Sequence, residues 1–343
     1  MIDVQQSPVA IAPDFEQTIK SVVQQAPVAR TLAEDLNKRG LRNVYLVGSG
    51  GSHFAAWPAY TLLMNNAKYL STHHLTSAQF SASPPKGCDG TSLVIAASHS
   101  GNTPETVEAA RVARRLGAVV VGISGPGSSQ LRENVDMMFD YPSEVTVTEP
   151  KVLHFVQIAL SILSVSESDQ DATSALEALP KFPAALLKVK EECGQLAEDV
   201  VEVIRDASLV YVLGSGGGFG AAAALAGCYL QEMQWLNAAA IDAGDFFHGP
   251  FEIVTEKTAV IVLTGEDRTR PMAERASRFV ETRSSRTAVV DTRSFSLPGL
   301  SSVQRSIFSS IVLASASRRL LDFIAAARQH DTSQRRYMYK VDY

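Results

Sequence analysis

The sequence of 343 residues is poor in cysteine, in tryptophan and in clustered positive charge. Its three cysteines, Cys88, Cys193 and Cys228, form no C-x-x-C pair, so neither a disulfide framework nor a thiolate metal site is expected. Lys and Arg number 31 against 36 Asp and Glu, without a basic block, which argues against nucleic acid or an anionic membrane as a partner. No apolar run could span a bilayer, and no signal-peptide pattern opens the chain. These absences predict a cytoplasmic protein.

What the sequence does contain is an internal repeat. The motif NVYLVGSGGSHFAA, from Asn43, returns as LVYVLGSGGGFGAA from Leu209, at an offset of 166 residues. The same offset aligns LVIAASHSGNTPE, from Leu93, with AVIVLTGEDRTRP from Ala259 without a gap. Two motifs that agree on one offset predict two copies of one structural unit.

Each copy alternates short apolar runs with helical segments, which predicts an α/β fold with a parallel sheet flanked by helices. Strands are expected near 43–48, 92–97, 118–123, 208–213, 259–264 and 287–291. Helices are expected at 52–66, 104–116, 218–236, 271–281 and 303–328, and over 14–39 with an interruption at Pro27. The polar stretch 165–174 is predicted to be a loop near the join of the two copies.

The glycine-rich motif GSGGS at 48–52 lies between a predicted strand and a helix, where backbone N–H groups can meet an anion. A dinucleotide site would need glycine at the sixth position and an acid about 20 residues further on. His53 and Lys68 stand near those two places. The motif therefore predicts an anion site and not a dinucleotide site.

The segment Ser98–Thr103 is the stronger signal for a phosphate. It offers three hydroxyls and a glycine between a strand and a helix, where open α/β sheets bind ligands. Such a loop suits a phosphate monoester without Lys or Arg, although a Ser/Thr-rich turn with a helix cap would look the same. In the second copy Thr264 and Glu266 replace Ser98 and Ser100. Because a carboxylate repels phosphate, we expect one phosphate site per chain, in the first copy.

A second constellation lies in the C-terminal copy. Glu232 falls near the end of a predicted helix, and His248 follows 16 residues later in a loop rich in glycine and aromatics. A carboxylate and a histidine are a plausible base and acid for proton transfer next to a carbonyl, as in triosephosphate isomerase. The alternative is a glutamate that caps the helix and a histidine that only packs.

Two further features remain open. The other histidines show no metal-ligand spacing, so no metal is expected; they are His53, His73, His74, His154 and His330. The tail RRYMYKVDY, at 335–343, is basic and aromatic, which suits a final strand or a contact with a partner.

The motifs GSGGSHFAA and SHSGNTPET resemble the sugar isomerase (SIS) domain, and the repeat resembles double-SIS proteins. These include the isomerase half of glucosamine–fructose-6-phosphate synthase and the fructosamine-6-phosphate deglycases. The resemblance runs from about residue 40 to the end. It implies two tandem three-layer αβα domains, flavodoxin-like in architecture. The implied parts are a helical segment at 1–40, a phosphate-binding domain at 41–170, a catalytic domain at 185–330 and a tail at 331–343 over the active site.

Carried over by position, the resemblance assigns the sugar phosphate to two loops of the first domain. The phosphate-binding residues would be Ser52, Ser98, His99, Ser100 and Thr103, with Gly50, Gly51, Val147 and Glu149 as further substrate contacts. His99 stands where the synthases usually have glutamine. Glu149 and Pro150 replace a serine and a threonine of the synthases, and we hypothesise that Glu149 pairs with the ammonium group at the aminoacyl end of the substrate.

The resemblance also assigns catalytic roles in the second domain. Glu232 would be the proton-shuttling base, and His248 would assist ring opening and protonate the departing group, in the family often from a neighbouring subunit. Lys340 matches a lysine that the tail of the synthases offers to the sugar. A homodimer or a higher homo-oligomer with shared active sites is therefore implied.

The leading hypothesis is a deglycase that cleaves a fructosamine 6-phosphate, the Amadori product of an amino acid, to hexose 6-phosphate and free amine. It would need neither metal nor organic cofactor. One alternative is an aldose–ketose or amino-sugar phosphate isomerase, and another is a sugar-phosphate-binding regulator without catalysis. Glutamine-dependent synthesis is not expected, because no amidotransferase domain precedes the first copy. The roughly 40 residues before that copy are also too few for a helix-turn-helix domain.

Overall fold

The computed structural model describes residues 9–338 and 340–342, which divide into two compact units. The first, the N-terminal unit, comprises 12–187 and 298–311. The second, the C-terminal unit, comprises the ranges 9–11 and 188–297 and the described residues from 312 onward. Within the described ranges, no helix has the length and apolar character needed to cross a membrane.

The N-terminal unit is built on a parallel sheet of five strands. They are β1 (Asn43–Gly48), β2 (Ser71–Thr76), β3 (Ser92–Ala97), β4 (Val119–Ser124) and β5 (Met137–Asp140). Their order is β2-β1-β3-β4-β5, which is the flavodoxin-like order. The predicted strands correspond to β1, β3 and β4, whose apolar runs are buried on both faces. The sequence analysis missed β2, a polar and half-buried edge strand, and β5, which has only four residues.

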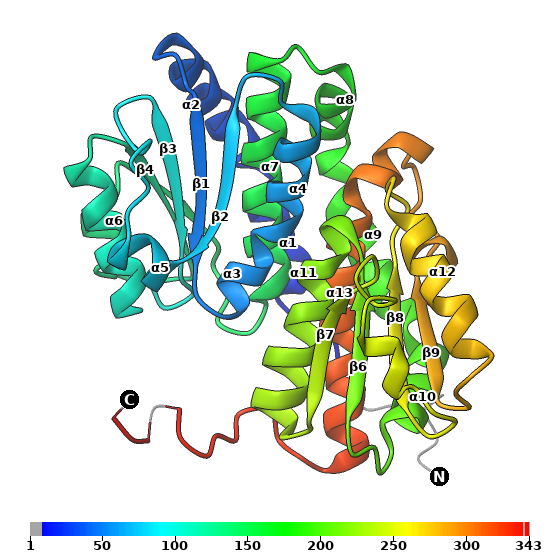
Figure 1. The fold of residues 1–343 in the computed structure, drawn as a ribbon. Helices are drawn as coiled ribbons and strands as arrows, with labels where there is room; N and C mark the ends of the chain where they lie inside the picture. Colours follow the sequence, from blue (N-terminus) through cyan, green and yellow to red (C-terminus); the bar gives the residue numbers. More distant parts are fainter. Residues whose placement is uncertain (1–8, 339, 343) are drawn as a thin grey trace. The chain divides into compact units, whose positions relative to one another are not determined.

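Helices cover both faces of this sheet. In Figure 1, α5 (Ser77–Ala82) and α6 (Pro104–Arg115) lie on one face, and α2 (Ala26–Lys38), α4 (Trp57–Asn66) and α7 (Thr148–Ser166) lie on the other. The remaining helices are α1 (Phe15–Val23), α3 (Gly51–Ala55), α8 (Gln170–Ala178) and α9 (Phe182–Glu192).

The sequence makes three predictions about the bounds of these helices. The interruption predicted near Pro27 is present, with Pro27 in the first turn of α2, where its missing N–H costs nothing. The single helix predicted over 52–66 is wrong, because α3 and α4 are separate. The loop predicted over 165–174 is also wrong. Asp169 is the N-cap residue of α8, and its side chain accepts a hydrogen bond from the Ala172 N–H at 3.0 Å, so a new helix begins at Gln170.

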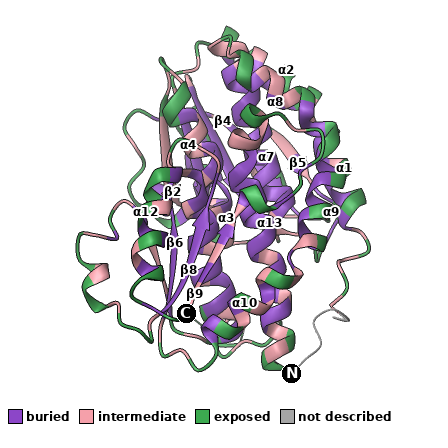
Figure 2. Cartoon of the chain, turned by 90° about the vertical axis from the view of Figure 1, so that its right-hand side faces the viewer, coloured by how far each residue is buried: buried purple, intermediate pink, exposed green. Residues whose placement is uncertain are grey.

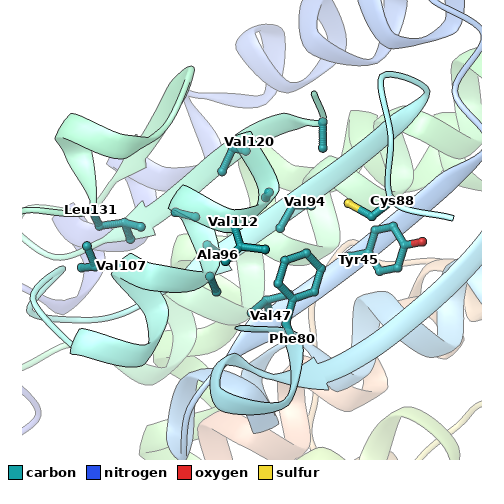
Figure 3. Packing of buried hydrophobic residues seen from close by; sticks show 14 residues of the cluster. Tyr45, Val47, Phe80, Cys88, Val94, Ala96, Val107, Val112, Val120 and Leu131 are labelled. Carbon is teal, nitrogen blue, oxygen red and sulfur yellow. The ribbon is translucent and has the colours of Figure 1, made fainter. Parts of the chain in front are cut away.

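The core of the N-terminal unit follows from the alternation of side chains along the strands. Tyr45 and Val47 of β1 point to the same face and pack with Phe80 of α5 and Val107 of α6 (Figure 3). On the opposite face α7 is buried along most of its length (Figure 2). This helix carries polar residues into the interior, among them Lys151 and His154.

The C-terminal unit repeats the same plan with four parallel strands. They are β6 (Val210–Gly214), β7 (Ala238–Asp242), β8 (Ala259–Thr264) and β9 (Thr287–Asp291), in the order β7-β6-β8-β9. This order matches the first four positions of the N-terminal sheet, so the internal repeat is a repeat of structure. A cluster around Phe246, Val260, Val262 and Val280 forms the core on one face.

The helices of the second half include one of unusual geometry. The regular ones are α10 (Gly194–Ile204), α11 (Phe219–Ala223), α12 (Arg270–Glu281) and α13 (Ser302–Arg328). The helix predicted over 218–236 begins as α11 and continues as a π-helix over Ala224–Met233. Short 3₁₀ turns lie at Arg132–Asn134, Leu179–Lys181, Gly216–Gly218, Pro250–Ile253 and Thr292–Ser294.

Candidate active site

The loop between β3 and α6 brings hydroxyl groups together at the carboxyl edge of the N-terminal sheet. Ser98 directly follows β3, and Thr103 is the N-cap residue of α6. Their hydroxyls share a hydrogen bond of 2.8 Å, and the Gly101 N–H donates to the Ser98 Oγ at 3.1 Å. Gly101 has φ +62°, and a Cβ there would lie 2.3 Å from the Ser129 Oγ, so the turn requires glycine. Ser100 is exposed, and its hydroxyl oxygen accepts a hydrogen bond from the Asn102 N–H at 3.2 Å.

The loop between β1 and α3 lies beside it, because β1 and β3 are neighbouring parallel strands. Gly50, with φ +52°, and Gly51 lead into α3, and Ser52 is buried. Gly48 is the last residue of β1, and a Cβ there would lie 2.8 Å from the backbone nitrogen of His53. The glycines of the GSGGS motif thus allow the backbone to turn sharply at the sheet edge, with Ser52 directed inward.

Lys151 supplies a cation that the sequence analysis did not expect at this edge. It lies on α7, is almost completely buried, and its Nζ donates to the Ser52 Oγ at 3.3 Å. The sequence predicts a phosphate loop that needs no Lys or Arg, and the structure adds a buried ammonium beside Ser52. The residue is 99 positions from Ser52 in the chain, and no local motif links the two. A buried ammonium next to a hydroxyl is well suited to a phosphate oxygen.

Both ring nitrogens of His99 have a polar partner. Its Nδ1 lies 2.9 Å from the Tyr141 hydroxyl, and its Nε2 lies 3.2 Å from a carboxylate oxygen of Glu144. Burial, followed by the nearby charge of Lys151, lowers the His99 pKa, and Glu144 partly offsets this. A Cβ on Gly125 would come within 2.7 Å of the ring. Because both ring nitrogens are engaged, His99 can contribute to anion binding through its backbone but hardly through its ring.

Two other predicted contacts lie at the start of α7. Val147 is the N-cap residue of this helix, and Glu149 follows in its first turn. Glu149 is only 1% exposed.

The corresponding loop of the C-terminal unit is filled by its own side chains. The repeat aligns Gly101 with Asp267 and Thr103 with Thr269. The Asp267 carboxylate accepts from the N–H of Thr269 at 2.7 Å and from its hydroxyl, while the Ser215 hydroxyl donates to the Thr269 carbonyl at 3.2 Å. The sequence analysis identified Glu266 as the residue unfavourable to phosphate. Asp267 is the carboxylate that occupies the loop.

Glu232 lies in the last turn of the π-helix, a geometry often associated with functional sites. Its Oε1 lies 2.8 Å from the Nη2 of Arg335, a residue of the C-terminal tail. Both side chains are mostly buried, and both line a pocket of about 410 Å³. Arg335 was not among the predicted site residues, since only the folded tail brings it to Glu232.

His248 and Lys340 do not line this pocket. His248 is exposed in the turn after β7, where its N–H donates to the Asp245 carbonyl at 2.9 Å. Lys340 is also exposed, and its Nζ donates to the Arg335 carbonyl at 2.6 Å. The structure therefore brings Glu232 together with the tail, and His248 lies apart from that pocket.

The remaining histidines pack or bind backbone groups. His53 and His74 stack with ring centroids 3.9 Å apart, and the His74 Nε2 lies 2.8 Å from the His53 carbonyl. Burial lowers the His74 pKa to about 4. In the part of the chain that the structure describes, no three His, Cys, Asp or Glu residues are grouped so as to hold a metal ion.

Comparison with known proteins gives a match to one protein family and to several individual proteins. The SIS domain matches residues 39–165 and 203–296. Fructosamine deglycase FrlB of Bacillus subtilis is 32% identical over 312 residues, which cover 90% of this chain and 95% of that protein. A fructoselysine 6-phosphate deglycase of Escherichia coli O157:H7 is 24% identical over 85% of this chain and 86% of its own length.

Solved structures agree with this likeness. A candidate phosphosugar isomerase of Bacillus subtilis superimposes with a TM-score of 0.87 at 30% identity, over 97% of this chain and all of that one. A candidate phosphosugar isomerase of Salmonella typhimurium gives the same TM-score at 33% identity, over 93% of this chain and 99% of its own.

Proposed function

The chain belongs to the SIS-domain family, and on that premise we propose that it is a deglycase. It would cleave a fructosamine 6-phosphate, formed from an amino acid, to a hexose 6-phosphate and the free amine. The relative at 32% identity, which is named a fructosamine deglycase and matches over nearly its whole length, supports this choice.

The observation that carries the proposal is the anion cradle of the N-terminal unit. Ser98 and Thr103 present hydroxyls at one loop, and Lys151 presents a buried ammonium to Ser52 at the neighbouring loop. A phosphate monoester matches this combination of neutral donors and one cation. Ser100 and the backbones of Gly50, Gly51 and His99 are proposed to complete its binding.

The proposed reaction converts the fructosamine to an imine by proton transfers and then hydrolyses the C1–N bond. Glu232 removes a proton from C1 of the open-chain sugar while the C2 carbonyl oxygen takes one up, which gives an enaminol. Return of a proton to C2 and loss of the proton on nitrogen give an imine at C1. Water then adds to C1, the C1–N bond breaks, and an aldose 6-phosphate and an amine result. Arg335 fixes one oxygen of Glu232, and His248 is proposed to exchange protons with the sugar oxygen and the leaving nitrogen.

The other assignments rest on charge and exposure. Glu149, buried at the start of α7, is proposed to pair with the ammonium at the aminoacyl end of the substrate. His248 is exposed in its own chain, which suits action in a neighbouring subunit of a homodimer or larger homo-oligomer. Lys340, whose Nζ lies beside Arg335 in the tail, is proposed to contact the sugar. A cytoplasmic location fits an intracellular sugar phosphate as substrate.

The test is a panel of fructosyl-amino-acid 6-phosphates, with hexose and hexosamine 6-phosphates alongside, in which amine release and ketose–aldose turnover are measured separately. Glu232→Gln should lower kcat for amine release about 10²- to 10⁴-fold, the usual contribution of a general base. The exposed Glu202→Gln, which breaks only a surface ion pair with Arg205, should keep wild-type rates. Amine release that survives in Glu232→Gln would contradict the assignment. Glu149→Ala in the same panel should change the preference among amines.

An aldose–ketose isomerase is the second candidate. The two solved structures described above, at 30% and 33% identity, are described as candidate phosphosugar isomerases. An isomerase would use the same phosphate cradle and base but would stop before water attacks C1. Turnover of hexose 6-phosphates without amine release from any fructosamine phosphate would favour it.

A further inference from the structure

The pocket beside Glu232 is formed by the end of the π-helix and by the tail. It has a volume of about 410 Å³, and its lining includes Glu232, Trp235, Asn237, Arg335, Arg336 and Tyr337. In Figure 1 the tail leaves α13 and passes the end of the helix that starts at α11. The proposed reaction uses only Glu232 and Arg335 of these residues, so the rest of the pocket has no assigned role. We call it the tail pocket.

The tail is attached to the helix end before it reaches this pocket. The Gln234 amide donates to the His330 carbonyl at 3.0 Å, and Arg328 donates to the Gln234 carbonyl at 3.3 Å. The indole of Trp235 meets the His330 ring edge-on at 4.5 Å. Arg335 also donates to the Thr332 carbonyl at 2.7 Å. These contacts fix the backbone of the tail, and they fix the positions from which Arg335 and Arg336 project.

The two arginines differ in what they bind. Arg335 forms the ion pair with Glu232, so these two charges cancel. The Arg336 guanidinium lies over the indole ring of Trp235, 4.3 Å from the ring centroid. With the described residues Arg336 makes no hydrogen bond or ion pair. The tail pocket therefore has one cation without an acidic partner among the described side chains.

The position over the indole holds the Arg336 guanidinium in place for an anion. A guanidinium carries N–H groups in a fixed fork, which can donate two parallel hydrogen bonds. A carboxylate fits this fork in bidentate fashion. The Arg336–Trp235 pair is thus a preformed site for a carboxylate in the same pocket as Glu232.

We propose that Arg336, held on Trp235, binds the α-carboxylate of the amino-acid part of the substrate. This inference rests on the proposed function, because it takes Glu232 to act at C1. When the amino acid is linked through its α-nitrogen, the carboxylate carbon is three bonds from C1 and falls within one small pocket. When lysine is linked through its side chain, the carboxylate is several bonds further away. The tail pocket therefore selects α-linked adducts.

The experiment compares two substrates that differ only in the carboxylate, fructosylglycine 6-phosphate and fructosylmethylamine 6-phosphate. For the wild type, kcat/KM should favour the glycine adduct about 10- to 100-fold, the effect of hydrogen bonds to a charged group. In Arg336→Gln this ratio should fall close to one. Arg336→Lys keeps the charge but loses the bidentate geometry, so its ratio should be intermediate.

Arg283→Gln is the matched control, because Arg283 also lies over an aromatic ring, that of Phe279, at 5.9 Å. It should keep the wild-type ratio. A general structural effect would change both substrates together and leave the ratio as it is. If amine is released from both substrates and Arg336→Gln keeps the wild-type ratio, the inference is overturned and the proposed function stands. If the wild type releases amine from neither, the proposed function fails, and the inference fails with it.

Discussion

Lys151 places an ammonium group 3.3 Å from the Ser52 hydroxyl while its side chain is almost completely buried. Removing a charged group from water is costly unless hydrogen bonds and opposite charge compensate. The hydroxyl of Ser52 supplies one hydrogen bond to this ammonium. A phosphate bound at the same sheet edge would add negative charge beside it, so we expect Lys151 to take part in ligand binding.

The first prediction at this scale concerns Lys151→Met, which keeps the length of the side chain and removes its charge. We expect the affinity for glucose 6-phosphate to fall about 10- to 100-fold, because a charge-assisted hydrogen bond is lost. Calorimetric titration measures this. The matched control is Lys188→Met, because Lys188 forms only an exposed ion pair with Glu191. Equal affinity in Lys151→Met and wild type would remove Lys151 from the phosphate site.

At the scale of the element, α7 is a buried helix that carries polar side chains into the interior. His154 is completely buried, with Nε2 3.2 Å from the Asp140 carbonyl and Nδ1 2.9 Å from the Gln157 amide. A neutral ring satisfies both contacts, since Nε2–H donates to the carbonyl and Nδ1 accepts from the amide. Burial lowers the His154 pKa to about 3.

This lowered pKa makes the stability depend on pH in a defined direction. Between pH 6.5 and about 3 the unfolded chain binds the proton on His154 and the folded chain does not, so stability is lost as the pH falls through this window. His74, with a pKa of about 4, acts in the same direction. Each such group contributes at most about 1.4 kcal/mol per pH unit.

Urea unfolding at pH 7 and pH 5 tests this. The free energy of unfolding of the wild type should fall by about 2 kcal/mol through His154 alone. His154→Gln should be less stable at pH 7 but should lose less on acidification. The same loss in the variant and the wild type would show that His154 is not the responsible group.

At the scale of the whole molecule, two copies of one fold have unequal sites. The N-terminal loop keeps its hydroxyls at the sheet edge, whereas the C-terminal loop binds its own Asp267 carboxylate through Thr269. Gly216 allows this closure, because a Cβ there would lie 2.6 Å from the Thr269 hydroxyl oxygen. Because this carboxylate takes up the donors of the second loop and repels anions, we expect phosphate to bind the first loop only.

The corresponding prediction is a stoichiometry of one hexose 6-phosphate per chain in calorimetric titration. Ser98→Ala should weaken this binding at least about tenfold, since it removes one donor and disturbs Thr103. Thr269→Ala, at the position that the repeat aligns with Thr103, changes the filled loop and should leave both affinity and stoichiometry at wild-type values. Two equivalents bound per chain would contradict the division of roles between the copies.

The sequence by itself determined the repeat, the α/β class and the central strands. These depend on local patterns, because strands buried on both faces are continuous apolar runs and glycine loops lie at their ends. The edge strands β2, β5 and β7 were missed, since half-buried, very short or alanine-rich strands carry no such pattern.

Only the tertiary structure decided which side chains meet. Lys151 reaches Ser52 because α7 packs across the sheet, and Arg335 reaches Glu232 because the tail is attached to the end of the π-helix. Asp267 fills the second loop because a tight turn directs it inward. The first two contacts join residues far apart in the chain, and their geometry depends on how whole elements pack. Local sequence patterns therefore predict which loops form the candidate site, and the packing of whole elements determines which charged side chains lie at them.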